Sequence, residues 1–129
     1  MMRPTTNRPA AATTAAPPTY TPAETAAAHK KLCEVYKLAA RAVKIQTNID
    51  NQALGIAALV NGAVMLEQAV GANSALPATD RATALSLAKA YTRTNAMGSF
   101  THRDDPAWQQ VLDDVNAEDA RMKAVCGGS

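Results

Sequence analysis

The clearest pattern in the chain is a series of apolar positions that follow one another at alternating spacings of three and four residues. This spacing places the side chains on one face of an α-helix, with the neighbouring charged residues off that face. A series held over about five heptads is typical of a coiled-coil seam, where one long helix packs on another. Gln52 is the one polar member. The apolar members, called the seam below, are Val35, Leu38, Ala42, Ile45, Ile49, Ile56, Leu59, Ala63, Leu66 and Val70.

Local signals at the two ends of the seam predict one continuous helix over about residues 22–70. In TPAE, Thr21 can cap the helix, Pro22 takes its first position and Glu24 completes a capping box. The next proline is Pro77, and the first stop signal is the VGANSALP segment before it. A helix of this length needs a partner surface along most of its length.

Two glycines, Gly55 and Gly62, lie seven residues apart and therefore on one face of this helix, beside the seam. Glycine inside a helix costs about 1 kcal/mol relative to alanine, so the close approach of a partner helix is the favoured explanation. The alternative is a break at Gly62, because Asn61 and Gly62 also form a turn dipeptide.

Two shorter helices are predicted after Pro77, over about residues 79–94 and 106–125. No segment alternates with the period of a β-strand. The predicted fold is therefore all-α, with one very long coiled-coil-type helix and two shorter helices packed against it in a single domain, residues 21–127. Residues 1–20, rich in Pro, Thr and Ala, are predicted to be a disordered arm.

The composition suits close-packed helices rather than a nucleic-acid-binding protein. Of the 129 residues, 47% are hydrophobic and only 4% aromatic, and the net charge is +2. A charge this small, without basic runs interleaved with aromatic residues, predicts no nucleic-acid partner.

The most apolar stretch, ALGIAALVNGAVML at residues 53–66, raises the question of a membrane segment. Fourteen helical residues span about 21 Å, short of the roughly 30 Å of bilayer hydrocarbon, and the flanking residues are polar. The stretch also continues the seam, so we interpret it as part of the packing helix, with a membrane-active helix as a weaker alternative.

Few residues form a pattern suited to catalysis or to binding a cofactor. His29 and Cys33 lie four residues apart on one helix face, which is half of a zinc site, and no second pair at metal spacing follows. Asp104 and Asp105 have a sufficient role as caps of the last helix. We therefore expect no enzyme activity, no cofactor and no metal.

The two cysteines, Cys33 and Cys126, are open to two interpretations. In an exported protein they could form one bridge that closes most of the fold. In a reducing compartment they would be small buried apolar residues.

The segment AAAHKKLCEVYKLAARAV and the later NAMGSFTHRDDPAWQQVLDD resemble the B-type N-terminal domain of trypanosome variant surface glycoproteins. The first has an early cysteine at the start of a very long helix, and the second has a loop leading to a D-P-x-W helix start. Together they cover about half of the predicted ordered chain. The family's members are longer and carry a signal sequence and an anchor signal, so this chain is expected to be a fragment or truncated copy.

The resemblance implies a non-enzymatic coat protein that shields the cell surface and serves antigenic variation and immune evasion. It implies dimers formed through the long helix, host antibodies as partners, and membrane attachment only through a glycolipid (GPI) anchor. It also implies a disulfide from Cys33, with Cys126 as its candidate partner. The alternative function is an intracellular or viral assembly or adaptor protein whose long helix docks on partner subunits.

Overall fold

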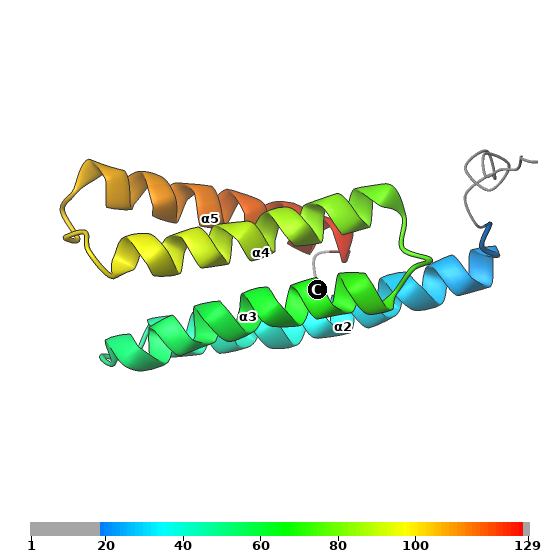
Figure 1. The fold of residues 1–129 in the computed structure, drawn as a ribbon, viewed down its shortest axis with the longest axis horizontal. Helices are drawn as coiled ribbons and strands as arrows, with labels where there is room; N and C mark the ends of the chain where they lie inside the picture. The colour runs from blue at the N-terminus through cyan, green and yellow to red at the C-terminus, as the bar shows by residue number, and fades with distance from the viewer. Residues whose placement is uncertain (1–18, 128–129) are drawn as a thin grey trace, which may run out of the picture.

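The computed structural model describes residues 19–127 as four helices that run alternately up and down (Figure 1). The helices are α2 (Pro22–Thr47), α3 (Gln52–Ala72), α4 (Ala78–Gly98) and α5 (Pro106–Val125). The described residues contain no strand, so the all-α prediction is confirmed. Apart from Thr19 and Tyr20, the arm predicted over residues 1–20 lies outside the described residues.

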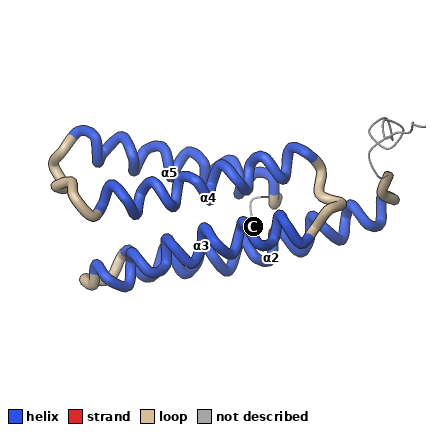
Figure 2. The backbone as a smooth tube through the Cα atoms, viewed as in Figure 1, coloured by secondary structure: helices blue, strands red, loops and turns tan. Residues whose placement is uncertain are grey.

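The helices form two layers, with α2 and α3 in one and α4 and α5 in the other (Figure 1). Each helix packs extensively on the next one along the chain: α2 on α3, α3 on α4, and α4 on α5. The loops α2–α3 and α4–α5 lie together at one end, and the loop α3–α4 lies at the other (Figure 2). The first and last helices, α2 and α5, are therefore antiparallel.

The prediction of one continuous helix over residues 22–70 is wrong, because the chain breaks at residues 48–51 into two antiparallel helices. The break also lies elsewhere than at Gly62, the position that the sequence favours for one. The two halves of the predicted rod pack on each other instead of on a distant partner.

Polar side chains in the sequence TNIDN satisfy the backbone groups that the break leaves unpaired. The side-chain amide of Asn48 donates from Nδ2 to the Lys44 carbonyl at 2.6 Å, and its backbone N–H donates to the Ile45 carbonyl. The Asn51 side chain accepts from the N–H of Leu54 at 3.2 Å and caps α3. Asn stabilises helix ends by such bonds, and this outweighs the apolar periodicity that runs through the segment.

The break divides the seam into a buried half and an exposed half. On α3, Leu59, Ala63, Leu66 and Val70 are buried and Ile56 is half-buried, as a packing face requires. On the first half, Val35 is half-buried, while Leu38, Ile45 and Ile49 are 62%, 47% and 45% exposed. Ala42 is exposed as well. We call Leu38, Ala42, Ile45 and Ile49 the outer stripe.

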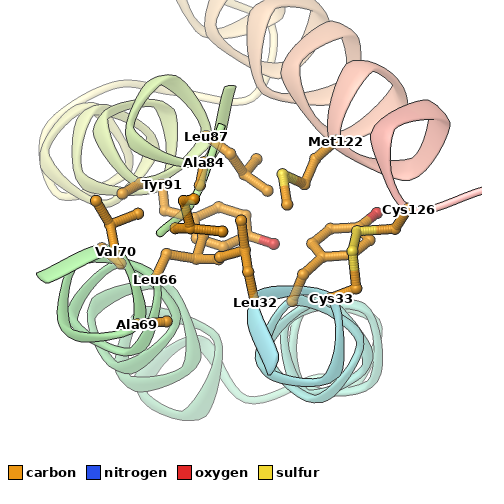
Figure 3. Close-up of a cluster of buried hydrophobic side chains, with 14 of the residues drawn as sticks. Leu32, Cys33, Leu66, Ala69, Val70, Ala84, Leu87, Tyr91, Met122 and Cys126 are labelled. Atoms are coloured by element: carbon orange, nitrogen blue, oxygen red, sulfur yellow. A yellow bond between two sulfur atoms is a disulfide. The ribbon is translucent and has the colours of Figure 1, made fainter. Parts of the chain in front are cut away.

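The buried face of α2 is the neighbouring one, which carries Ala28, Leu32, Cys33, Tyr36 and Ala39. It joins residues of α3, α4 and α5, among them Leu66, Leu87 and Met122, in one core (Figure 3). The buried residues of α2 therefore lie about one position further along the chain than the predicted seam, and the exposed seam residues of this helix point away from the core.

The helices predicted over residues 79–94 and 106–125 correspond to α4 and α5, and they begin in different ways. The cap predicted at Asp105 is present: its carboxylate accepts from the N–H of Ala107 at 2.8 Å, and α5 covers the predicted range. By contrast, α4 follows Pro77 without a side-chain cap. It also continues to Gly98, four residues beyond the predicted end, where an added Cβ would lie 3.3 Å from the Trp108 ring.

The glycines Gly55 and Gly62 differ in how closely they are approached. A Cβ on Gly62 would lie 3.0 and 3.1 Å from two ring carbons of Tyr91 in α4. At Gly55 the nearest atoms, in Gln46 and Thr47 at the end of α2, lie at 3.6 Å or more, which is ordinary contact. The close neighbour of Gly62 is thus a side chain of the same chain rather than a partner helix.

Within the described chain, α3 is the one helix long and apolar enough to cross a membrane. Eight of its residues are buried against the rest of the bundle, including Gly55, Gly62 and Leu66. It is therefore a core helix of the bundle.

Candidate functional site

A disulfide joins α2 to the end of α5 across the bundle. Cys33 and Cys126 are bonded, with their Cα atoms 5.6 Å apart (Figure 3). Because α5 otherwise packs extensively only on α4, this bond fixes the distance between the first and last helices at this end of the bundle.

A histidine and a buried carboxylate adjoin the bridge. His29 Nδ1 lies 2.7 Å from Asp80 Oδ2, and His29 Nε2 lies 3.6 Å from the Cys33 sulfur. The Asp80 carboxylate is buried and accepts only, so the His29 Nδ1 donates its hydrogen and the ring orientation is set. The contact links α2 to the first turn of α4.

In space, Cys33 contacts His29 and His29 contacts Asp80, which is the order of a thiol nucleophile, a general base and a carboxylate that orients the base. Here the Cys33 sulfur is bonded to Cys126, so it holds no thiol to attack a substrate. The described residues also contain no group of three or more potential metal ligands of the His, Cys, Asp or Glu type. The arrangement holds the imidazole of His29 between the Asp80 carboxylate and the Cys33 sulfur of the bridge.

Beyond the bridge, a groove of about 1200 Å³ lies between α2 and α5. The groove follows α2 from Tyr36 to Asn48 and α5 from Trp108 to Lys123. Its floor is formed by apolar and aromatic side chains of three helices: Leu59, Tyr91, Trp108, Leu112 and Val115.

Two tyrosines and one acid form the polar part of the floor. The Tyr36 hydroxyl donates to Asp119 Oδ1 at 2.8 Å, linking α2 to α5 at the end of the groove nearest the bridge. Burial raises the pKa of Tyr36 well above its usual range, and the hydrogen bond and charge of Asp119 add to this effect. Burial, and then the same carboxylate, also raise the pKa of Tyr91. Both phenols therefore stay neutral in the folded protein.

Because the pKa values of Tyr36 and Tyr91 are raised by folding, we expect the protein to lose stability in alkaline solution. Above pH 10, the ordinary tyrosine pKa, the unfolded chain releases phenolic protons that the folded chain keeps, so stability falls as pH rises. The slope is up to about 1.4 kcal/mol per pH unit for each phenol. In a Tyr20→Phe background, which leaves only Tyr36 and Tyr91, urea unfolding at a series of pH values and tyrosinate absorbance test this. Tyrosinate appearing while the helical circular dichroism is unchanged would contradict it.

The rim of the groove is positively charged. Its exposed cations are Lys37, Arg41, Lys44, Arg103 and Lys123. In the described part of the chain the ion pairs are His29 with Asp80, Arg93 with Asp114 and Arg121 with Glu118, so the rim cations have no acidic partner. Asp119 is the one acidic residue among those lining the groove, and it is bonded to Tyr36.

Of the predicted site residues, the structure brings Cys33 and Cys126 together, and it separates the two halves of the seam. Sequence reasoning missed the partnership of His29 with Asp80, which are 51 residues apart, and the groove itself. The spacing of Lys37, Arg41 and Lys44 along one helix face was a usable signal for the rim.

No protein-family model, no curated protein and no solved structure matches this chain.

Proposed function

We propose that this protein is a non-enzymatic helical coat protein of the cell surface, similar to trypanosome variant surface glycoproteins. It would shield the membrane by shape and packing and serve antigenic variation and evasion of the host immune response. The observation that carries the proposal is the Cys33–Cys126 bridge, because disulfides form and persist in oxidising compartments and outside cells.

Three further features support a structural role. Both bridge cysteines are buried, Cys33 at 6% and Cys126 at 9% exposure, which hinders attack by external thiols. The Cys33 sulfur is bonded, so the one arrangement that resembles a catalytic triad lacks its nucleophile. The helix α3 buries one face in the core, so attachment to the membrane is expected to use a lipid anchor rather than this helix.

Surface labelling tests this function directly. Antibodies raised against the folded, oxidised protein should stain cells that make it without permeabilisation, and the Cys33 and Cys126 thiols should resist alkylation until reductant is added. An antibody to a cytosolic protein serves as the control for intact cells. Staining that requires permeabilisation, together with free thiols in the cells, would overturn the proposal.

We also propose that the protein forms homodimers through the outer stripe. Leu38, Ala42 and Ile45 follow spacings of four and three residues on α2, Ile49 lies in the loop just after it, and all four are exposed. An uncharged stripe of this kind is typical of a helix that packs on a copy of itself about a two-fold axis. The long-helix dimer expected from the resemblance would thus use only the exposed half of the seam, on α2 and the loop after it.

Charges placed in the outer stripe are expected to separate the dimer. Leu38→Glu with Ile45→Glu should raise the dimer Kd by about tenfold or more, since two buried carboxylates would face apolar partners. Light scattering after size exclusion, over a series of concentrations, measures this. Leu85→Glu is the matched control, because Leu85 is 40% exposed on α4, away from the stripe. A monomeric wild type, or equal effects of both changes, would contradict this interface.

The alternative function is an assembly or adaptor protein that docks on partner subunits. The open groove between α2 and α5 favours it, since a helix could bind there. An adaptor of a reducing compartment should keep its complex in reductant, whereas a coat protein should be found with its bridge intact.

A further inference from the structure

We infer that the groove between α2 and α5 binds an acidic amphipathic α-helix of a partner protein. The inference rests on the shape, the floor and the charge of the groove, and it holds for either function considered above.

The dimensions of the groove fit a helix. From Tyr36 to Asn48 the α2 wall is about 18 Å long, and from Trp108 to Lys123 the α5 wall is about 22 Å long. These lengths correspond to about 12–15 residues of α-helix. The volume of about 1200 Å³ exceeds the range of roughly 300–1,000 Å³ usual for small-molecule pockets.

The floor fits the apolar face of such a helix. Trp108, Leu112 and Val115 are partly exposed and offer apolar contacts along the groove, with Leu59 and Tyr91 buried beneath them. Large aromatic side chains dominate the energetics of helix-binding interfaces. A helix that binds in this way presents apolar residues at every third or fourth position.

The charge of the rim determines which helix fits. Lys37, Arg41 and Lys44 form a row along α2, and Arg103 and Lys123 add charge at the two ends of the α5 wall. These five cations have no acidic partner in the described part of the chain, and one acid, Asp119, faces them. A helix with Glu or Asp on both sides of its apolar face would pair with this rim, whereas a basic helix would be repelled.

A synthetic peptide tests the inference. The probe is a fluorescein-labelled helix of about 15 residues, with Leu at every third or fourth position and Glu beside them. It should bind the oxidised full chain, as measured by fluorescence anisotropy, and bind less tightly as salt is added. The control peptide, in which every Glu is replaced by Lys, should not bind.

Variants of the protein locate the binding. Lys37→Glu with Arg41→Glu should weaken binding of the acidic peptide by about tenfold or more, because two attractive contacts become repulsive. The matched control is Lys31→Glu with Lys89→Glu, the same charge change at exposed positions that do not line the groove. It should leave binding within about twofold of wild type. Leu112→Gln, which carries no charge, should weaken binding through the floor alone. Circular dichroism confirms that each variant is folded.

Several results would overturn the inference. One is equal binding of the Glu and Lys peptides, and another is equal effects of the rim variant and its control. Binding of phosphatidylserine vesicles but not of the peptide would assign the groove to an anionic lipid surface. A loss of dimer mass in the rim variant without peptide binding by the wild type would assign it to a second copy of the chain.

Discussion

Replacing both cysteines with alanine, Cys33→Ala with Cys126→Ala, is expected to lower the free energy of unfolding by about 4–5 kcal/mol. The bridge joins residues 93 positions apart, and closing a loop of that length removes much of the conformational freedom of the unfolded chain. Because a small domain is stable by only about 5–15 kcal/mol in all, the variant is expected to be close to unfolded at body temperature.

In the variant without the bridge, local unfolding should begin at α5. This helix packs extensively on α4 alone, and the bridge is its covalent link to α2. Without the bridge, the amides of α5 are expected to exchange hydrogen faster than those of α3, which packs on both α2 and α4.

Urea unfolding of the oxidised wild type, the reduced wild type and the double variant measures the effect. Reductant serves as the internal control, since it should destabilise the wild type and leave the double variant unchanged. An oxidised wild type and a double variant with the same urea midpoint would show that the bridge does not stabilise this fold.

Gly62→Val is expected to destabilise the bundle by about 2–3 kcal/mol, because it overpacks a close contact. A Cβ at this position lies 3.0 Å from the Tyr91 ring and 3.4 Å from a methyl group of Val43. Tyr91 is 2% exposed and packed among core residues, so its ring has little room to move away. The branched side chain adds two methyl groups to the same space.

Alanine substitutions separate the close contact from helix propensity. Gly62→Ala should cost about 1 kcal/mol net, because the contact outweighs the gain in helix propensity. Gly55→Ala is the matched control on the same helix face: its new Cβ meets nothing closer than 3.6 Å, so it should stabilise by about 0.5–1 kcal/mol.

Thermal and urea unfolding of these variants, each also made in a Tyr91→Leu background, measure the coupling. Gly62→Ala should cost less where the ring is absent. Equal stabilisation by both alanine substitutions would show that the approach of Tyr91 to Gly62 is not a tight one.

The helix termini show how far local sequence determines structure. At TPAE the Thr21 side chain accepts from the N–H of Glu24 at 3.1 Å, and the Glu24 carboxylate accepts from the N–H of Thr21 at 2.8 Å. Every atom of this box lies within four residues, so the sequence was sufficient to predict it. The Asp105 cap is equally local.

The caps at the break over residues 48–51 are also local, but the break was not predicted, because the apolar spacing continues through it. Caps at Asn48 and Asn51 compete with a continuous helix, and the outcome depends on what the two halves gain by packing on each other. That gain comes from burying α3 against α2 and α4, which no window of the sequence contains.

The candidate site required the tertiary structure in full. His29 and Asp80, Tyr36 and Asp119, and Cys33 and Cys126 are pairs separated by 51, 83 and 93 residues. The groove lies between α2 and α5, which are far apart in the sequence, so its lining and its positive charge follow only from the packing of the bundle.

By itself, the sequence determined that this protein is helical and where its first and last described helices begin, because caps and periodicity act over a few residues. Which face of α2 is buried was decided only by the tertiary structure. That helix carries two apolar faces, one with Leu32, Tyr36 and Ala39 and one with Leu38, Ala42 and Ile45. Periodicity makes both faces candidates for the core, and burial follows the face that the turn at residues 48–51 brings against α3 and α4.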